Sequence, residues 1–334
     1  MIDSISQINS YINVLITGGT GFIGGSVLRR LCYEKYITTF TYRNKINILP
    51  LNARRCVINN INKKTDWFNA LQNQDIVLHC AGLAHIINER EFNPAQIFNE
   101  VNVEGTLNLA RQAVASGVNR FVFLSSIGVN GVKTEQGESF NELNIPNPHN
   151  YYSQSKLEAE QGLLRISNES GLEVVIIRPP LVYGYNAPGN FGSLKRAVQR
   201  GWPLPLGAVQ NQRSLLALDN LVDFIITCIN HPQAANQTFL VSDGQDLSTT
   251  ELVRGMAQAA GVTARLLPVP VWALQAGALF LGKGEAVQSL CGNLQVDISK
   301  ARSLLGWVPP VSVEEGLRRA MGKGMDSCLR RNDG

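Results

Sequence analysis

From about residue 13 to residue 178, short runs of apolar and β-branched residues alternate with longer amphipathic stretches. The short runs are continuously hydrophobic, which is typical of strands that are covered on both faces of a parallel sheet. Strands are expected at 13–17, 37–42, 56–58, 76–80, 120–125 and 173–178. Helices are expected from residue 22, over 94–116 and over 152–169. The alternation predicts an α/β fold with a doubly wound parallel sheet, whose ligands lie at the carboxyl ends of the strands.

After residue 180 the pattern changes, because glycine and proline become frequent between 184 and 207 and the elements become shorter. A smaller α/β lobe that binds substrate is expected here. Residues 213–218 and 237–241 look like strands that return to or flank the main sheet. The expected division is a nucleotide-binding domain of residues 11–180, to which 213–242 return, and a substrate lobe of 181–212 and 243–322. Residues 1–10 and 323–334 are expected to be disordered tails.

Composition narrows the class of protein. The net charge is +4 and the basic residues are scattered, so nucleic-acid binding is not expected. The six cysteines have no zinc-site spacing, which predicts buried, reduced thiols in a cytoplasmic protein and no metal site. The longest uncharged run, 266–282, is shorter than the roughly 20 residues that cross a bilayer. No membrane partner is therefore expected.

Three glycines follow the first strand and open the first helix. Gly18, Gly21 and Gly24 have the spacing of a dinucleotide fingerprint, in which glycines allow a tight turn and a close approach to pyrophosphate. The order of strand, glycine turn and helix predicts a Rossmann cofactor site. Phe22 and Ile23, between the last two glycines, are included in it.

The end of the second strand bears on the choice of cofactor. A carboxylate for the adenosine ribose is expected there, yet no Asp or Glu occurs between Glu34 and Asp66, and Arg43 stands in the place. An arginine can pair with a 2′-phosphate, which favours NADP, although an arginine lying over adenine in an NAD site is the alternative. Asn60 could bind the adenine edge or could simply make a turn.

Tyr152 and Lys156 are four residues apart on one expected helix, so their side chains share a face. A phenol that ionises near pH 10 needs about 4 kcal/mol from its surroundings to act as an acid/base at pH 7. An ammonium at about 4 Å supplies roughly that. A serine of the 125–126 pair, at a neighbouring strand end, could hold the substrate oxygen. The set predicts redox chemistry between a carbinol and a ketone on a bound nicotinamide.

Other residues complete the expected site. Small residues Cys80, Ala81 and Gly82 end the fourth strand and would let backbone approach the cofactor. His79 is interpreted as a packed strand residue rather than a catalyst. Mid-helix Asn102 is interpreted as a side chain that bonds backbone at the active end of the sheet, with a solvent-exposed side chain as the alternative. The segment with Pro179 and Val182 can form one wall. Arg213 could bind a diphosphate, with a solvated strand-end arginine as the alternative.

Taken together, these stretches resemble the extended short-chain dehydrogenase/reductase family, in its branch of nucleotide-sugar epimerases and reductases. The resemblance spans about residues 11–322. It rests on Gly18-Gly-Thr-Gly-Phe-Ile-Gly24, His79-Cys-Ala-Gly82, Asn102-Val-Glu-Gly-Thr106, Tyr152-Ser-Gln-Ser-Lys156 and Arg178-Pro-Pro-Leu-Val-Tyr-Gly184. In the second lobe, stretches beginning at Arg213 and at Leu305 add to it.

The resemblance implies roles for individual residues. Ser126 would orient the sugar, Tyr152 would exchange a proton at sugar O4, and Lys156 would be its electrostatic partner and a ribose ligand. Asn190 and Arg213 would bind the nucleotide diphosphate. The expected cofactor contacts are Gly18, Gly21, Phe22, Ile23, Gly24, Arg43, Asn60, Ile61, Cys80, Ala81, Gly82, Asn102, Tyr152, Lys156, Pro179 and Val182.

The implied reaction lies at C4 of a UDP-hexose or UDP-N-acetylhexosamine, in sugar synthesis for a surface polysaccharide, by a homodimer. Ile127 and Gly128 follow Ser126 where the dehydratase branch has an Asp-Glu pair, so 4,6-dehydration is rejected. A 4-epimerase and a 4-keto reductase both stay open, and Arg43 favours the reductase, because net reduction usually draws on NADPH. The alternatives are a non-catalytic NADP-binding sensor or scaffold and an epimerase of a lipid-linked saccharide.

Overall fold

The computed structural model describes residues 11–34, 36–43, 52–84, 93–280 and 284–322. The two expected tails and Cys328 lie outside these residues. Seven strands form one parallel sheet: β1 (Ile12–Thr17), β2 (Tyr36–Tyr42), β3 (Ala53–Val57), β4 (Ile76–His79), β5 (Arg120–Leu124), β6 (Glu173–Arg178) and β9 (Gln237–Leu240). Their order across the sheet is β3-β2-β1-β4-β5-β6-β9. The order reverses between β1 and β4, which is the place where such sheets bind ligands.

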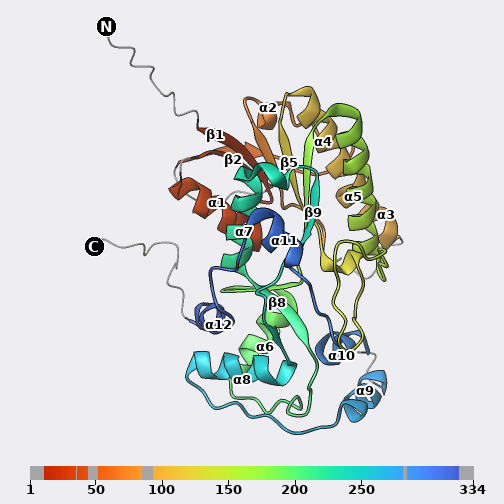
Figure 1. Ribbon diagram of the computed structural model, residues 1–334, viewed down its shortest axis with the longest axis vertical. Coiled ribbons are helices and arrows are strands. Elements are labelled where there is room, and N and C mark those ends of the chain that lie inside the picture. The colour runs from red at the N-terminus through yellow and green to blue at the C-terminus, as the bar shows by residue number, and fades with distance from the viewer. Residues whose placement is uncertain (1–10, 35, 44–51, 85–92, 281–283, 323–334) are drawn as a thin grey trace, which may run out of the picture.

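Helices cover both faces of this sheet in the upper half of Figure 1. One face packs against α1 (Phe22–Tyr33), α7 (Leu218–Asn230) and α11 (Ser299–Leu305), and the other against α2 (Phe68–Leu71), α4 (Gly105–Ala115) and α5 (Tyr151–Ser170). Burial on both sides explains why the strands are continuously apolar. The predicted doubly wound α/β fold is confirmed.

The helix that the sequence predicts over 94–116 is interrupted. It consists of α3 (Pro94–Phe98), a π-helical segment η1 (Asn99–Glu104) and α4. π-Helical turns are rare and occur frequently at functional sites, and this one contains Asn102. Two 3-10 turns, η2 (Ile127–Val129) and η3 (Pro232–Ala234), complete the connections around the sheet.

The second lobe lies below the sheet in Figure 1. It contains a three-stranded sheet of β7 (Leu181–Tyr183), β8 (Arg213–Ala217) and β10 (Asp246–Leu247). Around it pack α6 (Gly189–Gln199), α8 (Thr249–Ala260), α9 (Val271–Phe280), α10 (Gly284–Cys291) and α12 (Val313–Met321). A separate apolar cluster forms its core.

The strand expected from Arg213 does not join the main sheet. It runs parallel to β7, which follows the two prolines that end β6, and antiparallel to β10. Of the two expected returning strands, β9 is the one at the edge of the main sheet. The prolines separate β7 from the main sheet because proline cannot donate to a strand ladder.

The sequence predicts neither a membrane-spanning helix nor a metal site. No helix in the described ranges is both long and apolar enough to cross a membrane. No group of three or more His, Cys, Asp or Glu that could hold a metal ion occurs in the same ranges. The five described cysteines are free thiols, but only Cys228 is buried, because the others lie at the borders of the apolar clusters.

Candidate active site

The glycine turn packs strand, turn and helix so closely that side chains are excluded. Gly18 has φ of +70°, and a Cβ there would lie 2.8 Å from the backbone nitrogen of Ala81. A Cβ on Gly24 would lie 2.3 Å from the carbonyl oxygen of Gly18. Gly21 donates its N–H to the same oxygen at 2.9 Å and stands at the start of α1. This exposed helix N-terminus fits the pyrophosphate of a dinucleotide.

The end of β4 forms the next part of the same edge. Cys80 and Ala81 are half-buried and Gly82 is exposed. A Cβ on Gly82 would lie 3.2 Å from Nζ of Lys156 and 3.4 Å from Oδ1 of Asn102. Any larger residue would therefore close over the ammonium of Lys156, and glycine leaves it within reach of a bound ribose or nicotinamide.

The structure brings Ser126, Tyr152 and Lys156 together. Ser126 follows β5; its hydroxyl accepts from the N–H of Gly128 at 3.1 Å and lies close enough to the Tyr152 phenol to influence its pKa. Lys156 lies one turn further along α5, with Nζ 6.0 Å from the centre of the Tyr152 ring. Its Nζ donates to the carbonyl oxygen of Leu124 at 2.9 Å. We call these three side chains the catalytic group, after the role that the sequence predicts for them.

Burial dominates the electrostatics of this group. It raises the pKa of Tyr152, and the hydrogen bond with Ser126 opposes the increase. It lowers the pKa of Lys156 to about 8, opposed by interactions with Cys80 and Glu160. The phenol is thus held protonated, beside an ammonium that can lose its proton near neutral pH. Such a pair can exchange a proton with a bound hydroxyl or ketone.

Asn102 ties the π-helical segment to this edge. Its Oδ1 accepts from the N–H of Leu83 at 2.8 Å, and its Nδ2 donates to the Leu83 carbonyl at 3.0 Å and to Oγ of Ser155 at 3.0 Å. The prediction that Asn102 bonds backbone at the active end of the sheet is confirmed. The bonds fix the backbone just beyond Gly82 relative to α5.

His79 is buried between two hydroxyls and an aromatic ring. Its ring nitrogens bond to Oγ1 of Thr17 at 2.6 Å and of Thr106 at 2.9 Å, and it stacks on Phe123. Burial, and secondarily the Lys156 ammonium, lower its pKa to about 3. A neutral, fully bonded imidazole confirms the interpretation of His79 as a packed strand residue.

The remaining expected cofactor residues lie around this edge in varied environments. Arg43 is exposed at the carboxyl end of β2, and Asn60 is exposed in the loop after β3. Asn60 offers its carbonyl to Thr65 Oγ1 at 2.8 Å, so its backbone does shape a turn. Four others are at least partly buried: Phe22 packs on the second lobe, Ile23 and Val182 on one face of the main sheet, and Ile61 on the other. Pro179 is buried and its carbonyl accepts from the N–H of Ile127 at 2.9 Å.

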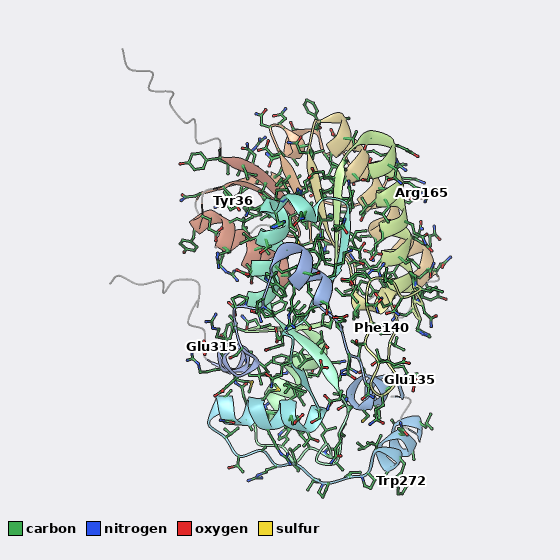
Figure 2. All side chains as sticks on the ribbon, viewed as in Figure 1. Tyr36, Glu135, Phe140, Arg165, Trp272 and Glu315 are labelled. Atoms are coloured by element: carbon green, nitrogen blue, oxygen red, sulfur yellow. The ribbon has the colours of Figure 1, made fainter. Side chains whose placement is uncertain are left out.

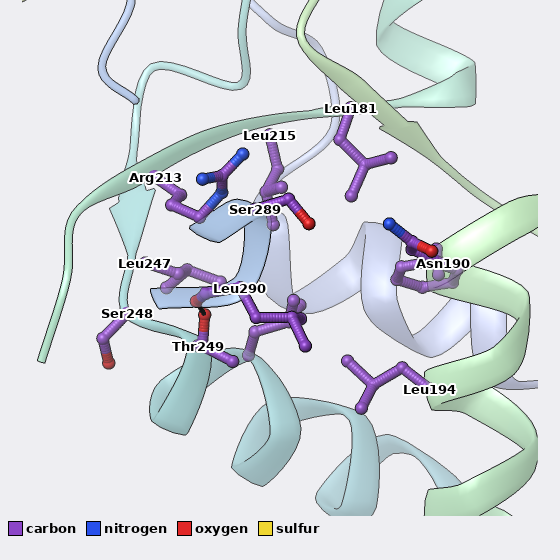
Figure 3. Close-up of a pocket in the computed structure, with 12 residues that line it drawn as sticks. Leu181, Asn190, Leu194, Arg213, Leu215, Leu247, Ser248, Thr249, Ser289 and Leu290 are labelled. Atoms are coloured by element: carbon purple, nitrogen blue, oxygen red, sulfur yellow. Dashed lines mark hydrogen bonds between the residues drawn. The ribbon is translucent and has the colours of Figure 1, made fainter. Parts of the chain in front are cut away.

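A cavity of about 120 Å³ opens in the second lobe. Figure 3 shows Asn190 from α6 and Arg213 from β8 on opposite sides of it. Its lining is otherwise mostly apolar: Leu181, Phe191, Leu194, Leu215, Leu247, Ser248, Thr249, Leu252, Ser289 and Leu290. The catalytic group does not line it. The structure therefore places the sequence-predicted residues in two clusters, one at the main sheet and one in this cavity.

Arg213 is suited to an anion. Its Nη1 donates to the carbonyl of Gly292 at 3.0 Å, and burial lowers its pKa. Within the described part of the chain no carboxylate forms an ion pair with it. A half-buried guanidinium without a carboxylate partner is favoured when an anion binds it, which fits a diphosphate.

Sequence reasoning missed a polar network next to the catalytic group. Glu160 and Arg178 form a buried ion pair, to which Ser125 and Asn130 are hydrogen bonded. One signal was present, since Glu160 follows Lys156 by four residues and so lies on the same helical face. The partner on β6 becomes visible only in the folded chain.

Comparisons with known proteins agree with this geometry. The model of the NAD dependent epimerase/dehydratase family matches residues 14–242. The chain is 44% identical to a UDP-glucose 4-epimerase of Vibrio cholerae, over 92% of this chain and 94% of that protein. It is 27% identical to N-acetyl-alpha-D-glucosaminyl-diphospho-ditrans,octacis-undecaprenol 4-epimerase of Escherichia coli O157:H7. This match covers 92% of this chain and 94% of that protein.

Among solved structures, UDP-glucose 4-epimerase of Thermotoga maritima with UDP-glucose has a TM-score of 0.74 at 24% identity. The match covers 93% of this chain and 97% of that one. The predicted resemblance and the prediction of a nicotinamide-dependent enzyme are confirmed, and a non-catalytic role is set aside. The chain therefore belongs to the NAD dependent epimerase/dehydratase family, of the extended short-chain dehydrogenase/reductase type.

Proposed function

We propose that the protein is a nucleotide-sugar 4-epimerase acting on a UDP-hexose or UDP-N-acetylhexosamine. The observation that carries the proposal is the catalytic group, assembled at the carboxyl ends of the strands beside the glycine turn. The 44% identity to a UDP-glucose 4-epimerase supports epimerisation over the 4-keto reductase alternative. By resemblance we also propose a cytoplasmic homodimer that serves synthesis of a surface polysaccharide.

In this proposal each side chain has a defined task. Ser126 orients the sugar 4-hydroxyl toward Tyr152, whose phenol oxygen exchanges the hydroxyl proton. Lys156 stabilises the phenolate form by its positive charge. The bound nicotinamide would supply the acceptor and donor of a hydride at sugar C4. Arg213 and Asn190 hold the diphosphate in the second-lobe cavity, so the nucleotide anchors the sugar next to the main sheet.

A turnover assay tests the proposal directly. Incubated with UDP-glucose or UDP-N-acetylglucosamine, the protein should form the corresponding 4-epimer until equilibrium, with no net change in absorbance of the reduced cofactor. An epimerase returns the hydride in each cycle, whereas a reductase would consume NADPH in proportion to product. Stoichiometric NADPH loss with a 4-keto sugar, and no isomerisation, would contradict the epimerase proposal.

We propose NADP as the preferred cofactor, on the ground of Arg43 and the missing carboxylate. Arg43→Ala should weaken NADP binding about tenfold or more, the scale of a lost hydrogen bond to a charged group, and leave NAD binding nearly unchanged. Isothermal titration of both dinucleotides measures this. Arg55→Ala, which removes an exposed arginine of β3, is the matched control. Equal losses for NAD and NADP would instead support an arginine stacked on adenine.

The exposed apolar surface of helix α9 favours a second candidate function. Helix α9 has no charged residue, and Trp272 and Leu279 on it are 72% and 76% exposed. Figure 2 shows Trp272 at the outer end of the second lobe. Such a helix could contact a lipid surface, and one relative is named for a lipid-linked substrate. Epimerisation of an undecaprenyl-diphosphate sugar in vesicles, without activity on the free UDP-sugar, would favour this candidate.

A further inference from the structure

Glu160 lies buried one helical turn after Lys156, with 2% of its surface exposed. Arg178, at the end of β6, holds both of its carboxylate oxygens: Nε lies 3.0 Å from Oε1 and 3.2 Å from Oε2, and Nη2 lies 2.5 Å from Oε2. Ser125 Oγ also donates to Oε1. The carboxylate therefore joins α5 to the ends of β5 and β6.

The same network reaches the segment after the catalytic serine. Nη1 of Arg178 donates to Oδ1 of Asn130 at 3.0 Å, and Nδ2 of Asn130 donates to the Asn141 carbonyl at 3.0 Å. Ser126 lies between Ser125 and η2, so the network fixes the backbone on both sides of it. Its position relative to Tyr152 thus depends on Glu160.

The charges of the network also bear on Lys156. Two buried cations, Lys156 and Arg178, flank one buried carboxylate, Glu160, so the three carry one net positive charge. His79 on β4, Cys80 directly after it and Tyr152 on α5 are the other titratable groups that face Lys156. None of these three groups is negative at neutral pH, because burial raises the pKa of Tyr152 and of Cys80 and lowers that of His79. Glu160 is therefore the fixed charge that favours a protonated Lys156.

We propose that Glu160 is a positioning residue of the reaction: clamped by Arg178 and Ser125, it keeps Lys156 charged and sets the upper pH limit of turnover. The statement about the pH limit of turnover rests on the proposed function. A purely structural ion pair is the competing explanation, because buried ion pairs are common without a catalytic role and often contribute little net stability.

Glu160→Gln separates the two explanations, since the amide keeps the shape and removes the charge. Without the carboxylate, the protonated form of Lys156 is less stable relative to the neutral amine, so Lys156 loses its proton at lower pH. The alkaline limb of the kcat/KM profile should move down by about one pH unit, the usual scale for a nearby opposite charge. At pH 8 this predicts a loss of up to about tenfold, with much less loss at pH 6.5. A uniform loss with an unmoved limb would overturn the proposal.

Three further variants serve as controls for this test. Glu158→Gln removes a half-buried carboxylate from the same helix and should leave the limb in place. Arg178→Lys keeps the positive charge but loses the guanidinium that contacts both carboxylate oxygens of Glu160. It should therefore lower kcat without moving the alkaline limb of the pH profile. If Glu160→Gln fails to fold, Glu160→Asp, which keeps the charge, is the substitute and should leave the limb within a few tenths of a unit. A shift as large as one unit in either of these charge-conserving variants would contradict the proposal.

A readout without substrate distinguishes failure of this inference from failure of the proposed function. The Cε chemical shift of Lys156, in protein with 13C-labelled lysine and assigned by Lys156→Met, reports its titration directly. Glu160→Gln should lower the apparent pKa of Lys156 by about one unit. An unchanged titration would refute the role of Glu160 even if the enzyme acts on another substrate. A lowered apparent pKa of Lys156 would support the role of Glu160 even if no UDP-sugar is turned over.

Discussion

Tyr152→Phe should reduce turnover of the UDP-sugar about a hundredfold or more, the usual scale for loss of a general acid/base. The ring and its packing remain, but the phenol oxygen beside Ser126, which we propose exchanges the substrate proton, is removed. Dinucleotide binding should stay within about twofold, because the glycine turn, Lys156 and Asn102 are untouched. Steady-state kinetics and isothermal titration measure the two quantities.

The neighbouring residue provides the control for this prediction. Tyr151 starts the same helix but is 57% exposed, so Tyr151→Phe should leave kcat and KM nearly unchanged. A Tyr152→Phe variant as active as the unmodified protein would show that another group exchanges the proton. The catalytic group would then have to be reassigned.

Gly24→Ala should weaken dinucleotide binding by tenfold to about a hundredfold and lower the melting temperature. The added methyl would lie 2.3 Å from the oxygen and 2.8 Å from the carbonyl carbon of Gly18. Because both atoms are backbone, the turn must move away from α1, and overpacking of this kind costs about 1–3 kcal/mol. Titration with NAD and NADP, together with thermal denaturation, tests the prediction.

Gly25→Ala is the matched control in the same helix. Its added methyl would lie 3.3 Å from the oxygen of Gly19, so a displacement of a few tenths of an ångström accommodates it. Alanine also favours a helix interior over glycine by roughly 0.5–1 kcal/mol. Equal effects of the two substitutions on affinity would mean that the turn does not shape the cofactor site.

Tyr152 and Lys156 illustrate how far local rules reach. Their four-residue spacing predicts that they share one helical face, and both lie on the same face of α5. The strands and the glycine turn were equally predictable. Apolar runs, helical periodicity and the tolerance of glycine for positive φ are properties of neighbouring residues.

Arg213 shows where those rules end. Its strand was expected near the main sheet, but β8 pairs with β7 and β10 and turns the guanidinium to a second-lobe cavity. The π-helical segment around Asn102 was likewise not foreseen, because its bonds to Leu83 join residues 19 positions apart.

The sequence by itself determined the α/β architecture, the glycine turn and the shared helical face of Tyr152 and Lys156, since each depends on spacing within a few residues. Only the tertiary structure decided the partner of β8, the second-lobe cavity and the clamp of Arg178 on Glu160. These depend on contacts between residues distant in the chain, and the free energy of such contacts is settled only when the whole chain packs.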